Sequence, residues 1–558
     1  MKFSDKILSQ TITQLCLAKG IEHIVISPGS RNAPLVIGFT ELEDFTCYSI
    51  VDERCAAFFA LGIAQQIKKP VALVCTSGSA LLNYYPAVAE AFYSDIPLII
   101  MSADRPSSHI EIGDGQTIQQ ENVFGNHILY NANCKEGDAH QPFNETGINA
   151  ALNKALTENG PVHINLPFSE PLYNIIMEPL VTPYSIPVLE KELLKGNELE
   201  IAMKPFITQW NQSKRKLILV GVLDPNSVEK QLVDTLAQDK SVIVLTETTS
   251  NIHHHQFFPA IDQLIAPLDD DGFEQLQPDL LLTFGGMVIS KKIKAFLRVY
   301  APKLHWHVDP KKANDTFFVL NKHLQSLPND FIKVLLENAI AVDSSYQNDW
   351  QAVRGHRLQR HEAYLKLIEF SDFKAFAEVF SLVPKNIQLQ LSNSATIRYA
   401  QLFDIHDSIE VFCNRGTSGI DGSMSTAIGA AVKSDKPTVF ITGDLSFFYD
   451  SNALWNNYIP TNFKIIVINN EGGGIFRILK GAKDTVHFET YFETKHQHTA
   501  NKLCEMHGFG YTSVIEEHAL RPSLSTFFNE SEGPKLIEIF TPSEVNDSIL
   551  LDYFKFIK

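Results

Sequence analysis

Short apolar runs alternate with amphipathic stretches along the first third of the chain. Four runs have the length and composition of buried strands, and they span residues 24–27, 71–75, 97–102 and 162–166. Between them apolar residues recur with helical spacing, for example over residues 53–66. Strands that alternate with helices in this way predict a parallel sheet with helices on both faces.

The last third of the chain repeats this pattern, and the middle third carries a version of its own. The predicted strands near the C-terminus are 409–412, 438–442, 463–468 and 535–540, and the central ones are 217–221, 242–245, 279–286 and 304–309. Helices are predicted over 423–432 and 450–458. A proline-rich connector at 178–189 and a polar helical stretch at 337–369 separate the three parts. We therefore predict an α/β protein of three domains, each with a parallel sheet flanked by helices, over residues 1–178, 190–336 and 370–558.

Composition and charge exclude several classes of protein. The 558 residues are 44% hydrophobic and 20% charged, which is ordinary for a globular protein of about three domains. The net charge of −17 without a basic stripe argues against a nucleic-acid partner. No apolar run reaches the roughly 20 residues of a membrane span, and the charged N-terminus is unlike a signal peptide, so we expect a cytoplasmic protein. Seven scattered cysteines without a C-x-x-C pair argue against zinc sites and disulfide frameworks.

Two of the predicted C-terminal strands end in polar residues. One is followed by Gly443-Asp444-Leu445-Ser446 and the next by Asn469-Asn470-Glu471-Gly472, so Asp444 and Asn470 stand 26 positions apart (470 − 444). The carboxyl ends of parallel strands open on one edge of the sheet, where the ligands of such sheets bind. There the Asp444 carboxylate, the Asn470 amide oxygen and the Gly472 carbonyl can hold a Mg²⁺ (or Mn²⁺) ion that carries a diphosphate. Turn residues often follow strands, so a pair of ordinary turns is the alternative.

This pair of segments resembles the thiamine diphosphate motif, in which Gly-Asp-Gly is followed about two dozen residues later by Asn-Asn. Leu445 stands where most of that superfamily has glycine, and Gly-Asp-Leu-Ser is similar to the form of one branch, the menaquinone-pathway synthases. The resemblance covers the whole chain, because the three predicted domains are similar in order to the pyrimidine-binding, central and diphosphate-binding domains of these enzymes. It implies that the chain binds thiamine diphosphate with Mg²⁺ or Mn²⁺.

The resemblance assigns the cofactor to segments in both end domains. Glu53 opens a helix after the second strand and matches the acid that hydrogen-bonds the aminopyrimidine of the cofactor and promotes its activation. An acid that merely complements the helix dipole is the alternative. The loop at 76–78 resembles the one that touches the pyrimidine, although it can also cap the next helix, and Ile420 matches an apolar residue under the cofactor, with core packing as the alternative. The implied cofactor-binding residues are Glu53, Thr76, Ser77, Gly78, Gly419, Ile420, Gly443, Asp444, Leu445, Ser446, Asn470 and Gly472.

Basic residues recur at the predicted carboxyl ends of strands, although the chain as a whole is acidic. The string at 27–31, Ser-Pro-Gly-Ser-Arg, ends the first strand and presents an exposed Arg31 beside free backbone N–H groups, which suits an anion. Arg105, Arg398 and Arg415 stand in comparable places. An arginine grips a carboxylate through two hydrogen bonds, whereas lysine acts as a point charge. Each one alone is more often a surface residue, but their joint placement indicates anionic ligands.

The strings around these basic residues closely resemble those of the menaquinone-pathway synthases. The implied substrate-binding residues are Ser30, Arg31, Arg105, Gln116, Lys291, Lys292, Ser394, Arg398, Arg415, Ile475, Phe476 and Leu479. Those implied to act in catalysis are Glu53, Arg31, Gln116, Ser394, Arg398 and Arg415. Gln116 and Ser394 match residues that orient the substrate or intermediate, and the apolar residues at 475, 476 and 479 match a pocket wall, with core packing as the alternative.

The resemblance implies a transferase with two small-molecule substrates, 2-oxoglutarate and isochorismate. The first is decarboxylated, and the resulting succinyl carbanion equivalent is added to the second in a 1,4 sense, in menaquinone biosynthesis. Because two subunits share each cofactor site in this superfamily, a homodimer at least is implied, and a homotetramer is favoured. Another thiamine diphosphate decarboxylase or carboligase, such as an acetolactate synthase, is an alternative, but no convincing dinucleotide fingerprint follows the strand at 217–221. An inactive cofactor-binding homologue is the other alternative, but it is expected to lack Glu53, Asp444 or Asn470.

Overall fold

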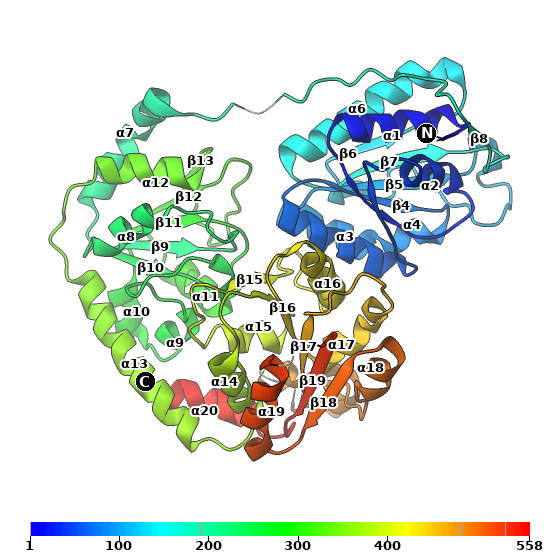
Figure 1. Ribbon diagram of the computed structural model, residues 1–558. Coiled ribbons are helices and arrows are strands. Elements are labelled where there is room, and N and C mark those ends of the chain that lie inside the picture. Colours follow the sequence, from blue (N-terminus) through cyan, green and yellow to red (C-terminus); the bar gives the residue numbers. More distant parts are fainter. Residues whose placement is uncertain (1, 190–191, 479–480, 482, 530–531) are drawn as a thin grey trace.

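The computed structural model describes residues 2–189, 192–478, 481, 483–529 and 532–558. Three parallel sheets, each covered by helices, form three lobes of the molecule (Figure 1). A short antiparallel pair joins β1 (Phe3–Ser4) to β8 (Ile175–Ile176). The prediction of an α/β protein with three helix-flanked parallel sheets is confirmed. The residue limits of the three domains remain our proposal.

The N-terminal sheet has six parallel strands in the order β3-β2-β4-β5-β7-β6. The strands are β2 (His23–Ile26), β3 (Thr46–Ser49), β4 (Val71–Cys75), β5 (Leu98–Asp104), β6 (Tyr130–Asn133) and β7 (Val162–Pro167). The covering helices include α1 (Ile7–Ala18), α2 (Ala33–Thr40), α3 (Glu53–Ile67), α5 (Tyr85–Ser94) and α6 (Gln141–Glu158). Strands β4 and β5 are buried along their whole length, as expected where helices cover both faces of a parallel sheet.

The C-terminal sheet repeats the same spatial order, β15-β14-β16-β17-β19-β18. Its strands are β14 (Gln388–Leu391), β15 (Glu410–Cys413), β16 (Thr438–Gly443), β17 (Lys464–Asn469), β18 (Gly510–Val514) and β19 (Lys535–Phe540). The helices around it include α14 (Asp372–Leu382), α15 (Ala395–Ala400), α16 (Ser423–Lys433), α17 (Asp444–Tyr449), α19 (Glu517–Asn529) and α20 (Asn546–Phe556). The two end domains are therefore two copies of one topology, and each presents the carboxyl ends of its strands along one edge.

The predicted helix at 450–458 is wrong. The chain instead forms α17 directly after β16 and then a short 3₁₀ turn at Ser451–Leu454. Asp450 explains the break, because its buried carboxylate accepts hydrogen bonds from the backbone N–H and the hydroxyl of Ser425 at 2.7 and 3.0 Å. The side chain is thereby turned inward, and the helix ends.

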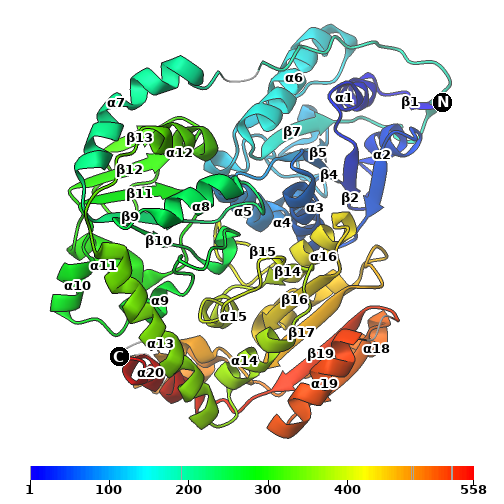
Figure 2. The ribbon, with the colours of Figure 1, turned by 60° about the vertical axis from the view of Figure 1, so that its left-hand side comes forward.

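The central sheet has five parallel strands in the order β10-β9-β11-β12-β13. The strands are β9 (Lys216–Val220), β10 (Val242–Leu245), β11 (Leu280–Phe284), β12 (Leu304–Val308) and β13 (Lys322–Leu324). The helices around it include α7 (Gly196–Gln212), α8 (Lys230–Gln238), α9 (Ile261–Ile265), α10 (Asp270–Leu276), α11 (Lys291–Val299) and α12 (Pro328–Glu337). The long helix α13 (Tyr346–Leu367) then leads to the C-terminal domain along the outside of the molecule (Figures 1 and 2).

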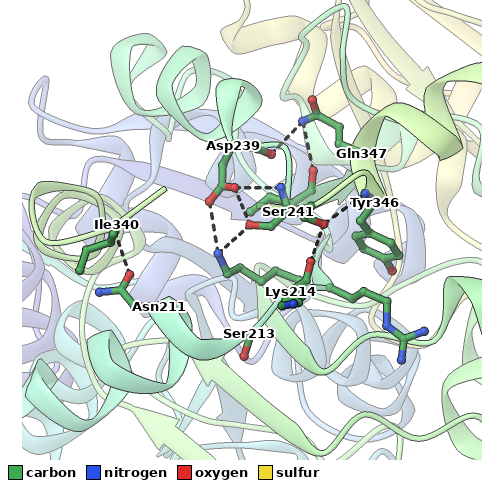
Figure 3. A network of polar contacts seen from close by, with 12 residues as sticks. Asn211, Ser213, Lys214, Asp239, Ser241, Ile340, Tyr346 and Gln347 are labelled. Carbon is green, nitrogen blue, oxygen red and sulfur yellow. Dashed lines mark hydrogen bonds and ion pairs between the residues drawn. The ribbon is translucent and has the colours of Figure 1, made fainter. Parts of the chain in front are cut away.

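A polar network docks the start of α13 on the central sheet. Gln347 donates hydrogen bonds to the backbone carbonyls of Ala237 and Val242 at 2.9 and 3.1 Å. Figure 3 shows Gln347 beside Asp239 and Ser241, and the Asp239 carboxylate accepts the Ser241 hydroxyl at 2.5 Å. Since these buried groups satisfy one another, the network fixes the direction in which α13 leaves the central domain.

The N-terminal and C-terminal domains share one apolar core where α3 faces α16 (Figures 1 and 2). Glycines allow the two helices to approach closely. A Cβ atom on Gly429 of α16 would lie 2.0 Å from the carbonyl oxygen of Phe59, and one on Gly62 of α3 would lie 2.1 Å from that of Thr426. Helix α3, which begins at Glu53, is thus held directly against the C-terminal domain. None of the helices within the described ranges has both the length and the apolar character needed to cross a bilayer.

Candidate active site

The C-terminal sheet edge brings Asp444 and Gly472 together, as the sequence predicts. Asp444 is the first residue of α17, after β16, and its Oδ2 accepts the backbone N–H of Gly472 at 2.9 Å. Gly472 has a φ of +152°, and a Cβ atom there would lie 2.7 Å from the carbonyl oxygen of Glu493, so only glycine fits. The backbone of Gly472 is therefore held next to the Asp444 carboxylate.

Asn470 lies beside this pair, directly after β17, and its side chain is nearly buried. Its amide nitrogen donates a hydrogen bond to Oδ2 of Asp372 at 2.8 Å. Among the described residues, none donates a hydrogen bond to its amide oxygen. Asp372 was not predicted, because an acid at the start of a helix is common and nothing in its local sequence points to Asn470.

These groups fit a hard divalent cation. The described residues contain no group of three His, Cys, Asp or Glu side chains that could hold a metal. An ion at this edge would rest on the Asp444 carboxylate, the Asn470 amide oxygen and the Gly472 carbonyl, which are the kinds of oxygen ligand that Mg²⁺ accepts beside phosphate and water.

His496 is a second residue that the sequence analysis missed. Its Nε2 lies 3.3 Å from Oδ2 of Asp444, and its ring stacks on that of His498 with centroids 5.3 Å apart. The nearby Asp444 carboxylate raises the pKa of His496. The signal in the sequence was a pair of histidines two positions apart, His496 and His498.

A loop after β15 carries the predicted residues Arg415, Gly419 and Ile420. The carbonyl of Gly419 accepts a hydrogen bond from Asn393 at 2.7 Å, and that of Ile420 accepts one from the Ser446 hydroxyl at 2.8 Å. The Ile420 and Ser446 segments therefore lie side by side at this edge. Gly443 and Leu445 flank Asp444 in the chain, and the Leu445 N–H bonds the Asp444 Oδ1 at 2.6 Å.

The N-terminal domain holds the start of the same loop. The carboxylate of Glu90, on α5, accepts the backbone N–H groups of Gly416 and Thr417 at 2.7 and 2.6 Å. A buried acid that binds two N–H groups fixes the loop firmly. Glu90 was not predicted, because its partners lie more than 320 positions away.

Three cations gather where this loop meets α15 and α11. Arg415 donates from Nη1 to the Asn393 side chain at 2.5 Å, and Arg398 donates to the carbonyl of Ser394 at 2.7 Å. Burial and the charge of Arg415 lower the pKa of Arg398, and burial likewise lowers the pKa of Lys294. Cations placed so close to one another suit an anionic ligand.

This cluster has one strained backbone position and one buried nitrogen atom without a hydrogen-bond partner among the described residues. Ser394 has φ 68° and ψ −127°, a conformation that non-glycine residues rarely adopt and that is often kept at functional sites. The Nε atom of Arg415 is buried without a hydrogen-bond partner in the described part of the chain. Both features agree with the predicted places of Ser394 and Arg415 in a binding site.

The predicted lysines open α11, where Ser290 caps the helix through the N–H of Ile293. Lys292 lies over the ring of Phe554 at 5.0 Å, so its ammonium group packs against α20. Lys291 is exposed. Lys294, one turn further, lies near Arg415 and is the lysine that the sequence analysis missed.

Glu247, at the end of β10, holds the loop before α11. Its buried carboxylate accepts the N–H groups of Ile289 and Ser290 at 2.6 and 2.7 Å. Burial raises the pKa of Glu247 to about 7, against the lowering effect of these hydrogen bonds and of Arg415. The central domain thus contributes a carboxyl group near the cation cluster.

The N-terminal sheet edge carries the other half of the predicted site. Glu53 is half-buried at the start of α3, where Asp52 caps the helix and Asn83 donates a hydrogen bond to Glu53 Oε2 at 3.3 Å. Thr76, Ser77 and Gly78 follow β4, and the hydroxyl of Ser77 is buried without a partner among the described residues. An orphaned buried hydroxyl suits a ligand that brings a hydrogen-bonding group.

The remaining predicted residues of this edge lie around the same loops. Gln116 is exposed with φ 56°, and a Cβ atom on Gly78 would lie 3.3 Å from its backbone. Arg105 donates from Nε to the carbonyl of Gly115 at 3.1 Å. Ser30 is exposed on the loop after β2. Among the described residues, the polar contacts of this group stay within the N-terminal domain.

The expectation of an exposed Arg31 is wrong. Its side chain is only 8% exposed, donates to the carbonyl of Phe168 at 2.8 Å and pairs with Glu170 at 3.2 Å. The chain after β7 folds back over this loop, and the guanidinium satisfies a backbone carbonyl there. Glu170 itself is 67% exposed, so an anion that binds Arg31 would have to compete with a solvated partner.

The predicted wall residues Ile475 and Phe476 lie on a short 3₁₀ segment (Gly474–Ile478) after the Asn470 turn and are half-buried. Phe476 packs near Phe492, with ring centroids 6.0 Å apart. Leu479 lies outside the described residues. A cavity of about 490 Å³ between the three domains is lined by Arg415 and Lys294, and Arg415 alone of the predicted residues in the described chain lines it.

Comparison with known families agrees with this division into two edges and a central domain. Family models match at residues 7–127 (thiamine pyrophosphate enzyme, N-terminal TPP binding domain), 187–376 (middle domain of thiamine pyrophosphate) and 394–539 (thiamine pyrophosphate enzyme, C-terminal TPP binding domain). The fold and the site together therefore define a thiamine diphosphate-dependent enzyme.

Relatives narrow the class to one family. Proteins named 2-succinyl-5-enolpyruvyl-6-hydroxy-3-cyclohexene-1-carboxylate synthase are 54% identical in Christiangramia forsetii, over 100% of both chains, and 57% identical in Flavobacterium johnsoniae, over 98% of both. One from Flavobacterium psychrophilum is 56% identical over 98% of both chains. The chain belongs to the family of these synthases, and the resemblance inferred from Leu445 and the arginine strings is confirmed.

Proposed function

We propose that the protein is a 2-succinyl-5-enolpyruvyl-6-hydroxy-3-cyclohexene-1-carboxylate synthase of menaquinone biosynthesis. It decarboxylates 2-oxoglutarate and adds the succinyl carbanion equivalent to isochorismate in a 1,4 sense. The observation that carries the proposal is the cluster of Lys294, Arg398 and Arg415 beside the Asp444 edge, in a chain whose relatives bear this name. Two polycarboxylate substrates need such a concentration of cations.

The Asp444 edge would hold the diphosphate of the cofactor through Mg²⁺ or Mn²⁺. Asp444, Asn470 and Gly472 supply its protein ligands, and Gly443, Leu445, Ser446, Gly419 and Ile420 line the cofactor beside them. When bound, thiamine diphosphate supplies the electron sink that decarboxylation of a 2-oxo acid requires. The protein binds, orients and shields the reactants around it.

Glu53 would bind the other end of the cofactor and exchange a proton with its aminopyrimidine ring. Glu53 is half-buried at the start of a helix, so its carboxyl group can contact a ligand and is partly shielded from water. The unpartnered Ser77 hydroxyl, with Thr76 and Gly78, would complete the pyrimidine contacts.

The cations would hold the substrate carboxylates. Arg398 and Arg415 would do so together with Lys291 and Lys292 at the start of α11, for which Lys292 has to leave the ring of Phe554. Ser394 and Gln116 would orient the substrate or the intermediate. Ser30, Arg31 and Arg105 would act from the N-terminal edge, and Ile475, Phe476 and Leu479 would wall the pocket against water. Arg31 has to exchange its Glu170 partner for a substrate in this role.

A second copy of the chain would complete each site, so the protein is proposed to be a homodimer at least, with a homotetramer as the favoured assembly. Apolar side chains flank Glu53 and α17 at the surface: Val51 and Leu82 are each 42% exposed, Tyr449 53% and Trp455 56%. A partner that covers them would remove this apolar surface from water. We also propose a cytoplasmic location, which suits the seven free cysteines.

The test incubates the protein with thiamine diphosphate, Mg²⁺ and 2-oxoglutarate, with and without isochorismate, and follows CO₂ release and the adduct by mass spectrometry. We expect the adduct only when both substrates are present. Decarboxylation without an adduct would refute the synthase assignment and leave the cofactor class intact. Adducts of pyruvate alone would instead indicate an acetolactate-type carboligase.

A Glu53→Gln variant tests the proposed proton exchange. We expect its kcat to fall by about 10²–10⁴-fold, because an amide cannot exchange the proton. Glu198→Gln is the matched control, since Glu198 is also a first-turn acid, on α7 of the central domain. If the two variants keep equal turnover, Glu53 serves only the helix dipole.

A further inference from the structure

The two ends of the Asn470 amide differ in what they can bind. Its oxygen is a metal ligand, whereas its nitrogen only donates hydrogen bonds. A half-turn about the last side-chain bond exchanges the two ends with almost no change in shape. A cation site built on an asparagine therefore needs a neighbour that distinguishes them.

Asp372 is such a neighbour, although it lies 98 positions away in the chain. It is the first residue of α14 and is only 3% exposed. Its Oδ2 accepts Nδ2 of Asn470 at 2.8 Å, and its Oδ1 accepts the hydroxyl of Thr541 at 2.6 Å. The backbone N–H of Asp372 donates to Oδ1 of Asn546 at 2.8 Å. Two hydrogen bonds thus hold the carboxylate in the interior, and a third holds the backbone of the same residue.

An ionised carboxylate accepts hydrogen bonds and donates none. If the Asn470 amide were reversed, its oxygen would face Oδ2 of Asp372, and two acceptors would meet in a buried place without a proton between them. Asp372 therefore permits one orientation, in which Nδ2 points to α14 and Oδ1 points away from it.

The proposed cation would lie on the side of Asn470 that faces away from α14. Asp444 and Gly472, its other proposed ligands, are joined to each other by the hydrogen bond between the Asp444 carboxylate and the Gly472 N–H. Thr541 follows β19, the neighbour of β17, so the bond from Thr541 also ties Asp372 to the sheet edge that carries Asn470.

We propose that Asp372 is a positioning residue that orients the Asn470 amide so that its oxygen faces the metal of the cofactor site. The inference rests on the proposed function. Asp372 does not touch the metal in this arrangement and acts through Asn470 alone. Residues of this kind hydrogen-bond a metal ligand without contacting the metal, and their substitution typically weakens metal affinity by about 10–100-fold.

The test measures Mg²⁺ affinity rather than turnover, by isothermal titration of full-length protein in saturating thiamine diphosphate. We expect Asp372→Ala to weaken Mg²⁺ binding by about 10–100-fold. Asp372→Asn should restore it to within about threefold, because its amide oxygen still accepts Nδ2 of Asn470 while its nitrogen donates to Thr541. Thr541→Val is the matched control, since it removes the other bond of Asp372 and leaves the bond to Asn470.

A double-mutant cycle separates positioning from a general structural role. In an Asn470→Ala background, Asp372→Ala should cause no further loss of Mg²⁺ affinity, because its only route to the metal is gone. Equal losses in both backgrounds would overturn the inference, as would an Asp372→Ala protein that binds Mg²⁺ like the wild type. Asp372→Ser, too short to reach Asn470, replaces Asp372→Ala if the latter does not fold. Wild-type protein whose cofactor binding is indifferent to Mg²⁺ would instead refute the proposed metal site itself.

Discussion

The contact between α3 and α16 makes a sharp prediction about Gly429. Its Cβ in a Gly429→Ala variant would lie 2.0 Å from the carbonyl oxygen of Phe59, where ordinary contacts begin at 3.4 Å. The obstacle is backbone, which cannot rotate away as a side chain can. The two helices would have to separate by about 1.4 Å, the difference between these two distances.

The magnitude follows from two opposing effects. Alanine is better than glycine inside a helix by about 1 kcal/mol, which favours the variant. Forcing extra volume into a packed contact costs about 1–3 kcal/mol, or more where the backbone must move. Because the obstacle here is backbone, the cost lies at the upper end, about 3 kcal/mol, and we expect a net loss of about 2 kcal/mol in the free energy that holds α3 against α16.

Hydrogen–deuterium exchange with mass spectrometry measures this local free energy. A loss of about 2 kcal/mol corresponds to about 30-fold faster exchange of the amides in α3 and α16. Gly355→Ala is the matched control, because Gly355 also lies inside a helix, α13, and a Cβ there would meet nothing within 4 Å. That variant should gain about 0.5–1 kcal/mol.

The two variants together test whether α3 and α16 lie too close for a side chain at position 429. If Gly429→Ala protects α3 and α16 as well as or better than the wild type, the close helix approach is refuted. If Gly355→Ala speeds exchange in α13 and Gly429→Ala does not speed exchange in α3 and α16, both expectations are contradicted.

Three further predictions concern single residues. Burial raises the pKa of Asp450 from 3.8 to about 6, so the native state binds more protons than the unfolded state in that window and stability falls as the pH rises through it. Asp450→Asn removes the cost of ionising this buried carboxyl group. In urea unfolding, the stability of the variant relative to wild type should therefore grow by up to about 3 kcal/mol between pH 4 and pH 6. A stability difference that does not change with pH would contradict this prediction. Arg415→Lys should raise the KM for 2-oxoglutarate about 10-fold or more in steady-state kinetics, with a smaller change in kcat, because lysine cannot bind a carboxylate through two hydrogen bonds. An unchanged KM would contradict the proposed contact between Arg415 and the substrate carboxylate. Ser77→Ala should leave the melting temperature of cofactor-free protein unchanged but weaken thiamine diphosphate binding about 5–10-fold by calorimetry, unless the unpartnered hydroxyl has no ligand role.

One strand that the sequence missed, β14, has polar side chains that contact another domain. Strand β14 (Gln388–Leu391) alternates glutamine with leucine, so it lacks an apolar run. Gln388 donates to Gln66 of α3 at 2.8 Å, and Gln390 lies 3.4 Å from Gln65. These buried glutamines are satisfied across the domain contact, which no local pattern can reveal.

Sequence alone determined the class of the protein and the segments that carry its chemistry. Alternating apolar runs and helical spacing are local, and so are the strings around Asp444, Asn470 and Glu53, so both could be read without coordinates. Tertiary structure decided how the side chains are used. It turned Arg31 inward, set Lys294 beside Arg415 and placed a distant Asp372 against the Asn470 amide. These outcomes depend on contacts between residues far apart in the chain, and such contacts arise only when the sheets and helices pack.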